Sequence, residues 1–165
     1  MRIATAADMP ALEQVAVATL KLAYPDEEIQ QTTLPGFREQ RTRTTTIIYC
    51  MDDLSAFILT ERMGDGSWCV KKLMPPPPVM TVQMSVELIK AAFVREHLLR
   101  PFLTPATTMM WTQTEERSAV ERLTRDAMQQ SFKATRTDIV RNGVIIASRL
   151  SMTAAALARK LQVTL

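Results

Sequence analysis

Residues 68–84 read WCVKKLMPPPPVMTVQM and join a strand-like run to the start of an apolar helix. Four consecutive prolines, Pro75 to Pro78, occupy the junction. Proline has no backbone N–H, and the junction holds no glycine. A loop that binds phosphate needs glycines and free N–H groups. The junction therefore lacks the chemistry of a phosphate cradle.

The segments around this junction alternate between the patterns of strands and helices. β-branched and aromatic residues predict strands, and apolar residues at helical spacing predict amphipathic helices. The expected strands are residues 1–4, 45–51, 54–62, 68–73, 107–112, 132–140 and 144–150, and the expected helices are residues 9–22, 26–31, 82–99, 115–127 and 152–162. Asp8 and Ser151 are the expected N-caps of the first and last helices.

Asn142-Gly143, between two apolar runs, is the strongest turn signal in the chain. Both residues tolerate positive φ, so the pair predicts a type I′ hairpin that joins Thr137–Val140 to Val144–Ala147. We therefore expect an α/β fold, with a mixed, mostly antiparallel sheet flanked by helices and an added C-terminal helix. We expect one domain over residues 1–150, followed by a docking helix or tail over residues 151–165.

The order of these elements and two local stretches resemble the GCN5-related N-acetyltransferase (GNAT) family. RIATAADMPAL at residues 2–12 is similar to the opening strand and first helix of that family. SAVERL at residues 118–123, followed by Phe132 and then residues 138–149, is similar to its closing helix and final hairpin. The resemblance implies a GNAT-like fold over residues 1–150. In an active member, it also implies a glycine-containing loop that binds the pyrophosphate of acetyl-CoA.

The chain departs from that family where the chemistry would reside. The resemblance places the pyrophosphate loop within residues 75–84, which hold no glycine, and a general-acid tyrosine near Thr124. The threonine hydroxyl has a far higher pKa than that of tyrosine and is a poor proton donor. The strand at residues 68–73 offers Lys71 and Lys72 but no carboxylate. We therefore expect a degenerate scaffold with no catalytic, cofactor-binding or metal-binding residues and no cofactor.

Composition bounds the class of protein. The chain has 165 residues, 47% of them hydrophobic, and a net charge of +3, which is too mild to argue for nucleic acid. No run is long enough to span a membrane, and the N-terminus has no signal-peptide pattern, so we expect a cytoplasmic or virion-associated protein that is not secreted. Cys50 and Cys69 lie in apolar runs and are expected to be buried, reduced thiols. With His97 as the only histidine, we expect no zinc site.

Arg38, Arg41 and Arg43 form the one local cluster of cations that suits phosphate oxygens. They are candidate phosphate contacts, with a plain solvated loop as the alternative. Apart from Phe37, no aromatic residue interleaves with them, so bases have no platform to stack on. Nucleic acid is therefore a weakly supported partner.

The segment after the fourth expected strand suggests binding to a protein. Four prolines make a stiff extended strut, and adaptable methionines stand beside it. The candidate partner-binding residues are Pro75, Pro76, Pro77, Pro78, Val79, Met80, Leu157 and Leu161. The alternative is that the proline segment only plugs the vacated cofactor cleft. Likewise, the tail helix is expected to dock either on its own domain or on another copy.

From these observations we expect a non-catalytic structural or assembly protein on a degenerate acetyltransferase-like scaffold, used for protein partners or self-assembly. A phage virion or assembly component is one such role, by analogy with other stripped scaffolds of this type. The first alternative is an active N-acetyltransferase with a divergent acetyl-CoA loop. The second alternative is a small nucleic-acid-associated protein.

Overall fold

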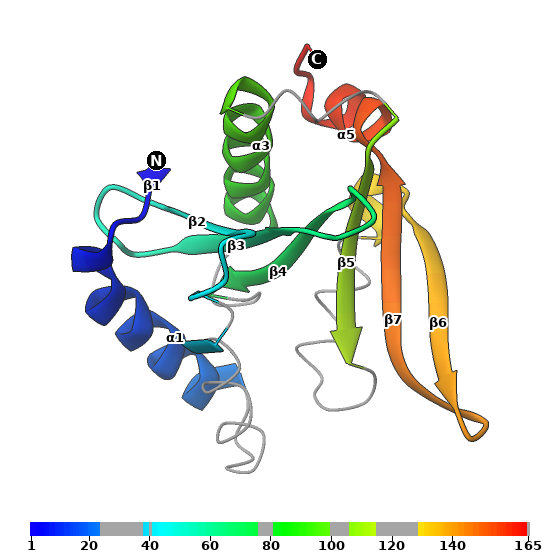
Figure 1. The fold of residues 1–165 in the computed structure, drawn as a ribbon, viewed down its shortest axis with the longest axis horizontal. Coiled ribbons are helices and arrows are strands. Elements are labelled where there is room, and N and C mark those ends of the chain that lie inside the picture. The colour runs from blue at the N-terminus through cyan, green and yellow to red at the C-terminus, as the bar shows by residue number, and fades with distance from the viewer. Residues whose placement is uncertain (24–37, 40, 76–80, 100–105, 115–128, 165) are drawn as a thin grey trace.

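The computed structural model describes residues 1–23, 38, 39, 41–75, 81–99, 106–114 and 129–164, which form an α/β fold (Figure 1). The strands are β1 (Arg2–Ile3), β2 (Thr46–Cys50), β3 (Phe57–Arg62), β4 (Trp68–Met74), β5 (Thr108–Thr114), β6 (Thr135–Arg141) and β7 (Val144–Thr153). The helices are α1 (Met9–Ala23), α3 (Val82–Leu99) and α5 (Ala154–Leu161), and a 3₁₀ turn spans Ala6–Asp8. The expected class, a mostly antiparallel sheet flanked by helices and followed by a C-terminal helix, is confirmed.

The seven described strands form one sheet in the order β1-β2-β3-β4-β5-β7-β6. Every neighbouring pair is antiparallel except β4 and β5, which are parallel. Their pairing covers Trp68–Val70 of β4 and Met109–Trp111 of β5. Beyond Val70, β4 continues along β3 and β5 continues along β7, so the two parallel strands diverge (Figure 1). β4 ends at Met74, past the point of divergence, and leads into the β4–α3 junction.

Helices cover both faces of the sheet (Figure 1). On one face, Leu12 and Ala16 of α1 pack with Ile48, Phe57 and other buried residues of β2 and β3. On the other face, α3 packs over alternate side chains of these strands, such as Tyr49 and Ile58, and α5 lies against β5 and β7 in the same core. β3 is therefore buried on both sides, as its apolar sequence predicts, because successive strand residues point to opposite faces.

The β6–β7 turn confirms the predicted hairpin. Asn142 has φ 52° and Gly143 has φ 76°, so both residues adopt the positive φ that a type I′ turn requires. The predicted pairing of Thr137–Val140 with Val144–Ala147 holds in part: Val140 pairs with Ile145 and Ile139 with Ala147, whereas Asp138 and Thr137 pair with Ser148 and Arg149. A bulge between Ile139 and Val140 then shifts the partners by one residue.

The predicted start of β6 is wrong. Residues 129–132 are helical, and β6 begins at Thr135 rather than at Phe132. Lys133 has φ 54°, a left-handed conformation that commonly ends a helix. The apolar character of Phe132 reflects its burial in the core, where it is 2% exposed, and not a place in the sheet.

The last helix begins later than predicted. Ser151 lies in β7, where it pairs with Met110 and Thr135, so it cannot be the N-cap. Thr153 takes that role, and its hydroxyl accepts a hydrogen bond from the backbone N–H of Ala156 at 3.2 Å. Because β7 runs to Thr153, the predicted boundary at residue 150 falls inside a strand.

The tail helix packs on its own domain. Leu157 is 0% exposed and Leu161 is 3% exposed, and both belong to the core that contains α3. Of the two predicted docking alternatives, the structure shows the intramolecular one. Leu157 and Leu161 are therefore core residues, and their predicted role as partner-binding residues is wrong.

Asp8 does not cap α1 as predicted but anchors the start of the chain. Its carboxylate accepts two hydrogen bonds from the Arg2 guanidinium, at 2.6 and 2.7 Å. It also accepts hydrogen bonds from the backbone N–H and the hydroxyl of Thr5, both at 2.7 Å. These hydrogen bonds, those from Arg2 first, hold the pKa of the Asp8 carboxyl well below its ordinary value.

We expect this anchor to make stability fall at acid pH. A carboxyl whose pKa is depressed on folding contributes fully above its unfolded pKa, and its contribution is lost as the pH falls towards the folded pKa. Between about pH 6 and about pH 3, the melting temperature should therefore fall less in Asp8→Asn than in the wild type. Thermal melts across this range check it, with the exposed Glu87→Gln as control. Parallel curves for wild type and Asp8→Asn would contradict the assignment.

Candidate functional site

The β4–α3 junction is the place where a GNAT-like fold would hold its coenzyme. Pro75 is half-buried directly after β4. Pro76, Pro77, Pro78, Val79 and Met80 lie outside the described residues, so their roles as partner contacts stay predictions. The description resumes at Thr81, which immediately precedes α3.

The start of α3 is capped by its own sequence. The Thr81 hydroxyl accepts a hydrogen bond from the backbone N–H of Met84 at 3.2 Å, and the Thr81 carbonyl accepts one from the N–H of Ser85 at 3.0 Å. Free N–H groups in the first turn are what a helix offers to an anion. One of them is already used here, and the prolines upstream supply none. Sequence reasoning missed this cap, although a threonine just before an apolar run is its usual signal.

We therefore expect no measurable binding of acetyl-CoA. The prolines before α3 have no backbone N–H to donate, and the Thr81 hydroxyl already accepts the N–H of Met84 in the first turn of α3. Isothermal titration calorimetry on the full chain should give no saturable heat. A dissociation constant below about 100 µM, which corresponds to about −5.5 kcal/mol, would overturn this expectation.

The three arginines proposed as phosphate contacts are paired with carboxylates. Glu13 of α1 accepts hydrogen bonds from Arg38, with Nε at 2.7 Å and a second, shorter contact, and from Arg41 at 3.2 Å. Arg43 contacts Glu39 at 2.7 Å and Glu61 at 3.3 Å. The hydrogen bond from Arg38, and then the charge of Arg41, lower the pKa of Glu13. A phosphate would have to displace these carboxylates, so the cluster offers little free positive charge.

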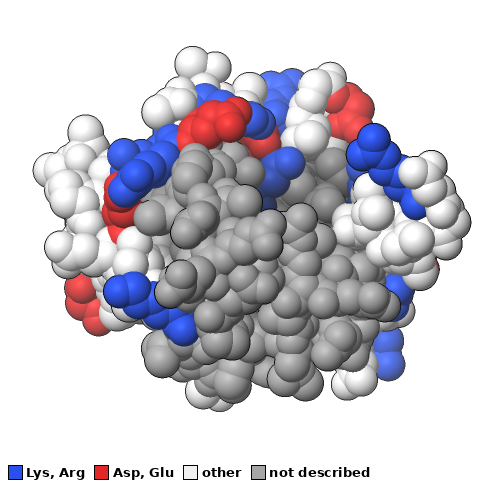
Figure 2. Space-filling view, turned by 90° about the horizontal axis from the view of Figure 1, so that it is seen from below, with Lys and Arg blue, Asp and Glu red and all other residues white. Residues whose placement is uncertain are grey.

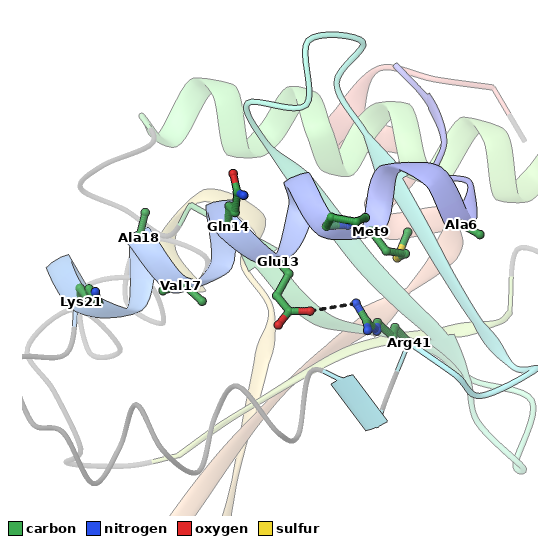
Figure 3. Close-up of a pocket in the computed structure, with 9 residues that line it drawn as sticks. Ala6, Met9, Glu13, Gln14, Val17, Ala18, Lys21 and Arg41 are labelled. Carbon is green, nitrogen blue, oxygen red and sulfur yellow. Dashed lines mark hydrogen bonds and ion pairs between the residues drawn. The ribbon is translucent and has the colours of Figure 1, made fainter.

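A cavity of about 700 Å³ opens between α1 and Arg41 (Figure 3). Its α1 wall includes Met9, Val17 and Lys21. Figure 3 shows Arg41 directed at the Glu13 carboxylate on the cavity wall. The one arginine of the cluster that lines the cavity is therefore held by an ion pair. This arrangement serves packing between α1 and the loop better than it serves an anionic ligand.

Glu61 is a buried carboxylate that sequence reasoning missed. It is 7% exposed at the end of β3, and it forms ion pairs at 3.3 Å with Lys71 of β4 and with Arg43. Burial raises the pKa of Glu61, but Lys71 and Arg43 outweigh it, so the pKa is lowered. A carboxylate with a lowered pKa is a weak base. The cluster is suited to holding β3, β4 and the arginine loop together, and less suited to proton transfer.

The two cysteine thiols are poorly placed to react. Cys50 and Cys69 are buried and free, as predicted, and burial raises the pKa of Cys69 to about 11. Within the described ranges, no group of three or more His, Cys, Asp or Glu residues is placed to hold a metal ion. None of the described helices is long and apolar enough to cross a membrane.

The outer end of the β6–β7 hairpin is the most exposed apolar part of the described chain. β5 pairs with β7 only as far as Ala147, so residues 139–146, the hairpin arm, extend past the end of β5 (Figure 1). The exposed fractions are 58% for Val140, 61% for Val144, 39% for Ile145 and 42% for Ile146. These side chains lie on both faces of the arm, because Val144 and Ile145 are successive strand residues and point to opposite faces. Sequence reasoning identified the turn but not the exposure of its flanks.

Comparison with known proteins assigns no family: no protein-family model matches the chain, and no curated protein matches it.

Proposed function

We propose that the chain is a non-catalytic assembly protein on a degenerate GNAT-like scaffold, and that the hairpin arm is a contact for protein partners or for other copies of the chain. The observation that carries this proposal is the set of exposed β-branched side chains on both faces of the arm. A role as a phage virion or assembly component is the finer proposal, by analogy with other scaffolds that lack their catalytic groups.

The arm is physically unsuited to standing alone in water. A two-stranded hairpin without further strands or helices against it is at best marginally stable. β6 also ends the sheet, so in the described structure its outer edge is not paired to another strand. An open edge beside apolar side chains favours pairing with another chain. Burial of each of the four exposed side chains would contribute about 1 kcal/mol to the free energy of association. Together these contributions are enough to support association.

The scaffold part of the proposal is supported by topology. The described elements keep the order on which the GNAT resemblance rests, with one parallel strand pair at the centre. The same topology would serve an active N-acetyltransferase. The Thr81 cap and the low-pKa Glu61 favour the non-catalytic interpretation over that alternative.

The nucleic-acid alternative receives no support from the charge distribution of the described residues. Figure 2 shows the molecule from below the view of Figure 1. Around the edge of this face, the described Lys and Arg side chains are interspersed with Asp and Glu. The arginine cluster at residues 38–43 is part of such a mixture, since its cations are paired with Glu13, Glu39 and Glu61. A duplex or single strand would need a continuous basic surface.

Variants of the arm test the proposal. One variant combines Val144→Thr with Ile146→Thr, and the other combines Val140→Thr with Ile145→Thr, which are cross-strand partners; threonine keeps the β-branched shape. We expect at least one pair to reduce the mass of the assembly measured by size-exclusion chromatography with light scattering, with little change in melting temperature.

The matched control is Leu98→Ser, which removes an apolar side chain of α3 that is 75% exposed and lies outside the arm. This variant should keep the wild-type mass. If the wild type is a monomer that also captures no partner, or if both arm variants assemble like the wild type, the proposed role of the arm is wrong.

A further inference from the structure

A second cavity, of about 850 Å³, lies beside α5 where β5, β6 and β7 meet. Three cations line it: Lys133 before β6, and Arg159 and Lys160 on α5. Hydroxyl groups also line it, including those of Thr108, Thr135 and Ser151. Among the described residues that line it, none is Asp or Glu. The cavity therefore combines positive charge with neutral hydrogen-bond donors.

The charge of this cavity is not neutralised within the described chain. None of the described ion pairs involves Lys133, Arg159 or Lys160. This contrasts with Arg38, Arg41 and the rest of the arginine cluster, where every cation meets a carboxylate. Like charges around one cavity raise its potential and attract an anion. A helix C-terminus favours nearby cations, which accounts for the cations at the helix ends here. It does not account for the hydroxyl groups that line the same cavity.

Lys133 is held at the cavity by an uncommon backbone conformation. Its φ is 54°, in the left-handed region that a residue with a side chain seldom adopts. The same conformation ends the helical turn at residues 129–132, and it places Lys133 between that turn and β6.

The cavity adjoins the start of β6, the strand that forms the open edge of the described sheet. Thr135 lines the cavity and is also the first residue of β6, and the other end of β6 enters the hairpin arm. An extended peptide that added to this edge would run from the arm into the cavity. Met152 and Ala156 give the cavity an apolar wall as well, which suits a peptide better than a bare phosphate. Two of the three cations are lysines, which act as point charges and lack the two-pronged geometry that arginine offers to phosphate.

We infer that this cavity binds an acidic segment of a protein partner, and that the partner continues along the β6 edge. The inference rests on the proposed function, because it takes the partner to be a protein. Carboxylates of the segment meet Lys133, Arg159 and Lys160, and the hydroxyls donate to the same carboxylates. The apolar side chains that follow reach the hairpin arm.

The test uses a labelled peptide of six glutamates with capped ends, with binding to the full chain followed by fluorescence anisotropy at low salt. The site variant is Lys133→Asn with Arg159→Gln and Lys160→Gln. Asparagine tolerates the left-handed conformation, and glutamine keeps the helix. Control substitutions at Lys21, Lys90 and Arg95, each to glutamine, remove the same charge from α1 and α3.

We expect affinity to fall at least about tenfold, or about 1.4 kcal/mol, in the site variant and to change less than about twofold in the control. Equal loss in both variants would show that net charge alone attracts the peptide, and the inference would be wrong. It would also be wrong if the wild type did not bind, or if inorganic pyrophosphate displaced the peptide at lower concentration than free hexaglutamate does. These outcomes leave the arm variants untouched, because their assembled mass is measured without the peptide.

Discussion

Replacing Leu157 by alanine is expected to lower the free energy of unfolding by about 2–5 kcal/mol. Leu157 is fully buried in α5 and packs in the same core as Phe93 of α3. The change removes buried apolar surface and leaves a cavity, and both effects destabilise the folded chain. Urea denaturation of wild type and variant, followed by circular dichroism, measures the difference.

The control for Leu157 is Arg159→Ala, two residues further along the same helix and exposed. Its effect should stay within about 0.5 kcal/mol, because exposed helix positions tolerate alanine. Truncation after Leu150 extends the test, since it removes α5 and the last three residues of β7. Those residues pair with Thr108, Met109 and Met110 of β5, so the truncated chain should lose its cooperative transition. A truncated chain that unfolds like the full one would contradict the packing of α5.

Local chemistry made much of the fold predictable. The type I′ turn follows from two adjacent residues, Asn142 and Gly143, whose intrinsic tolerance of positive φ needs no tertiary help. The strands β2, β3 and β4 follow from runs of apolar and β-branched residues that sit close to their predicted bounds. In each case the deciding interactions lie within a few residues of one another.

The errors arise where distant pairing overrides local preference. Ser151 and Thr153 are both good caps in isolation. Pairing of β7 with β5 keeps Ser151 in the strand and leaves the cap to Thr153. The sequence around Phe132 looks like a strand because it is apolar, yet its burial comes from packing at the end of a helix. Neither outcome follows from propensity alone.

The candidate sites were harder to predict because their parts are far apart in sequence. In the sequence, the arginine cluster has no obvious carboxylate partner other than Glu39. In the structure, Glu13 of α1 and Glu61 of β3 form ion pairs with it. The cationic cavity joins Lys133 to Arg159 and Lys160 across two strands, which no linear pattern shows. The hairpin arm was visible as a turn, but its exposure depends on β5 pairing no further than Ala147 of β7. The proline segment after Pro75 lies mainly outside the described residues, so its predicted role stays a prediction.

The second large loss of stability is expected from disrupting a buried polar network between α3 and the sheet. Tyr49 of β2 is 0% exposed, and its hydroxyl donates to the Glu96 carboxyl at 2.8 Å. The Thr60 hydroxyl lies 3.3 Å from the same oxygen and 3.3 Å from the Ile47 carbonyl, so its single proton is shared between two acceptors. Glu96 is 1% exposed, so water cannot readily replace a donor that is removed. Tyr49→Phe should therefore lower the free energy of unfolding by about 1–3 kcal/mol, and Thr60→Val, which loses the longer contact, by less.

A double-variant cycle separates this hydrogen bond from simple loss of packing. Glu96→Leu removes the acceptor and leaves the buried Tyr49 hydroxyl without this bond, so each single variant is destabilised. Tyr49→Phe in the Glu96→Leu background removes a donor that has already lost this acceptor, and the second change should cost little. The expected coupling free energy is about 0.5–3 kcal/mol, measured from four urea denaturation curves. Additive effects of the two substitutions would mean that Tyr49 does not stabilise the chain through its hydrogen bond to Glu96, and that α3 is held on the sheet mainly by apolar contacts such as that between Phe93 and Trp68, whose ring centroids lie 6.3 Å apart.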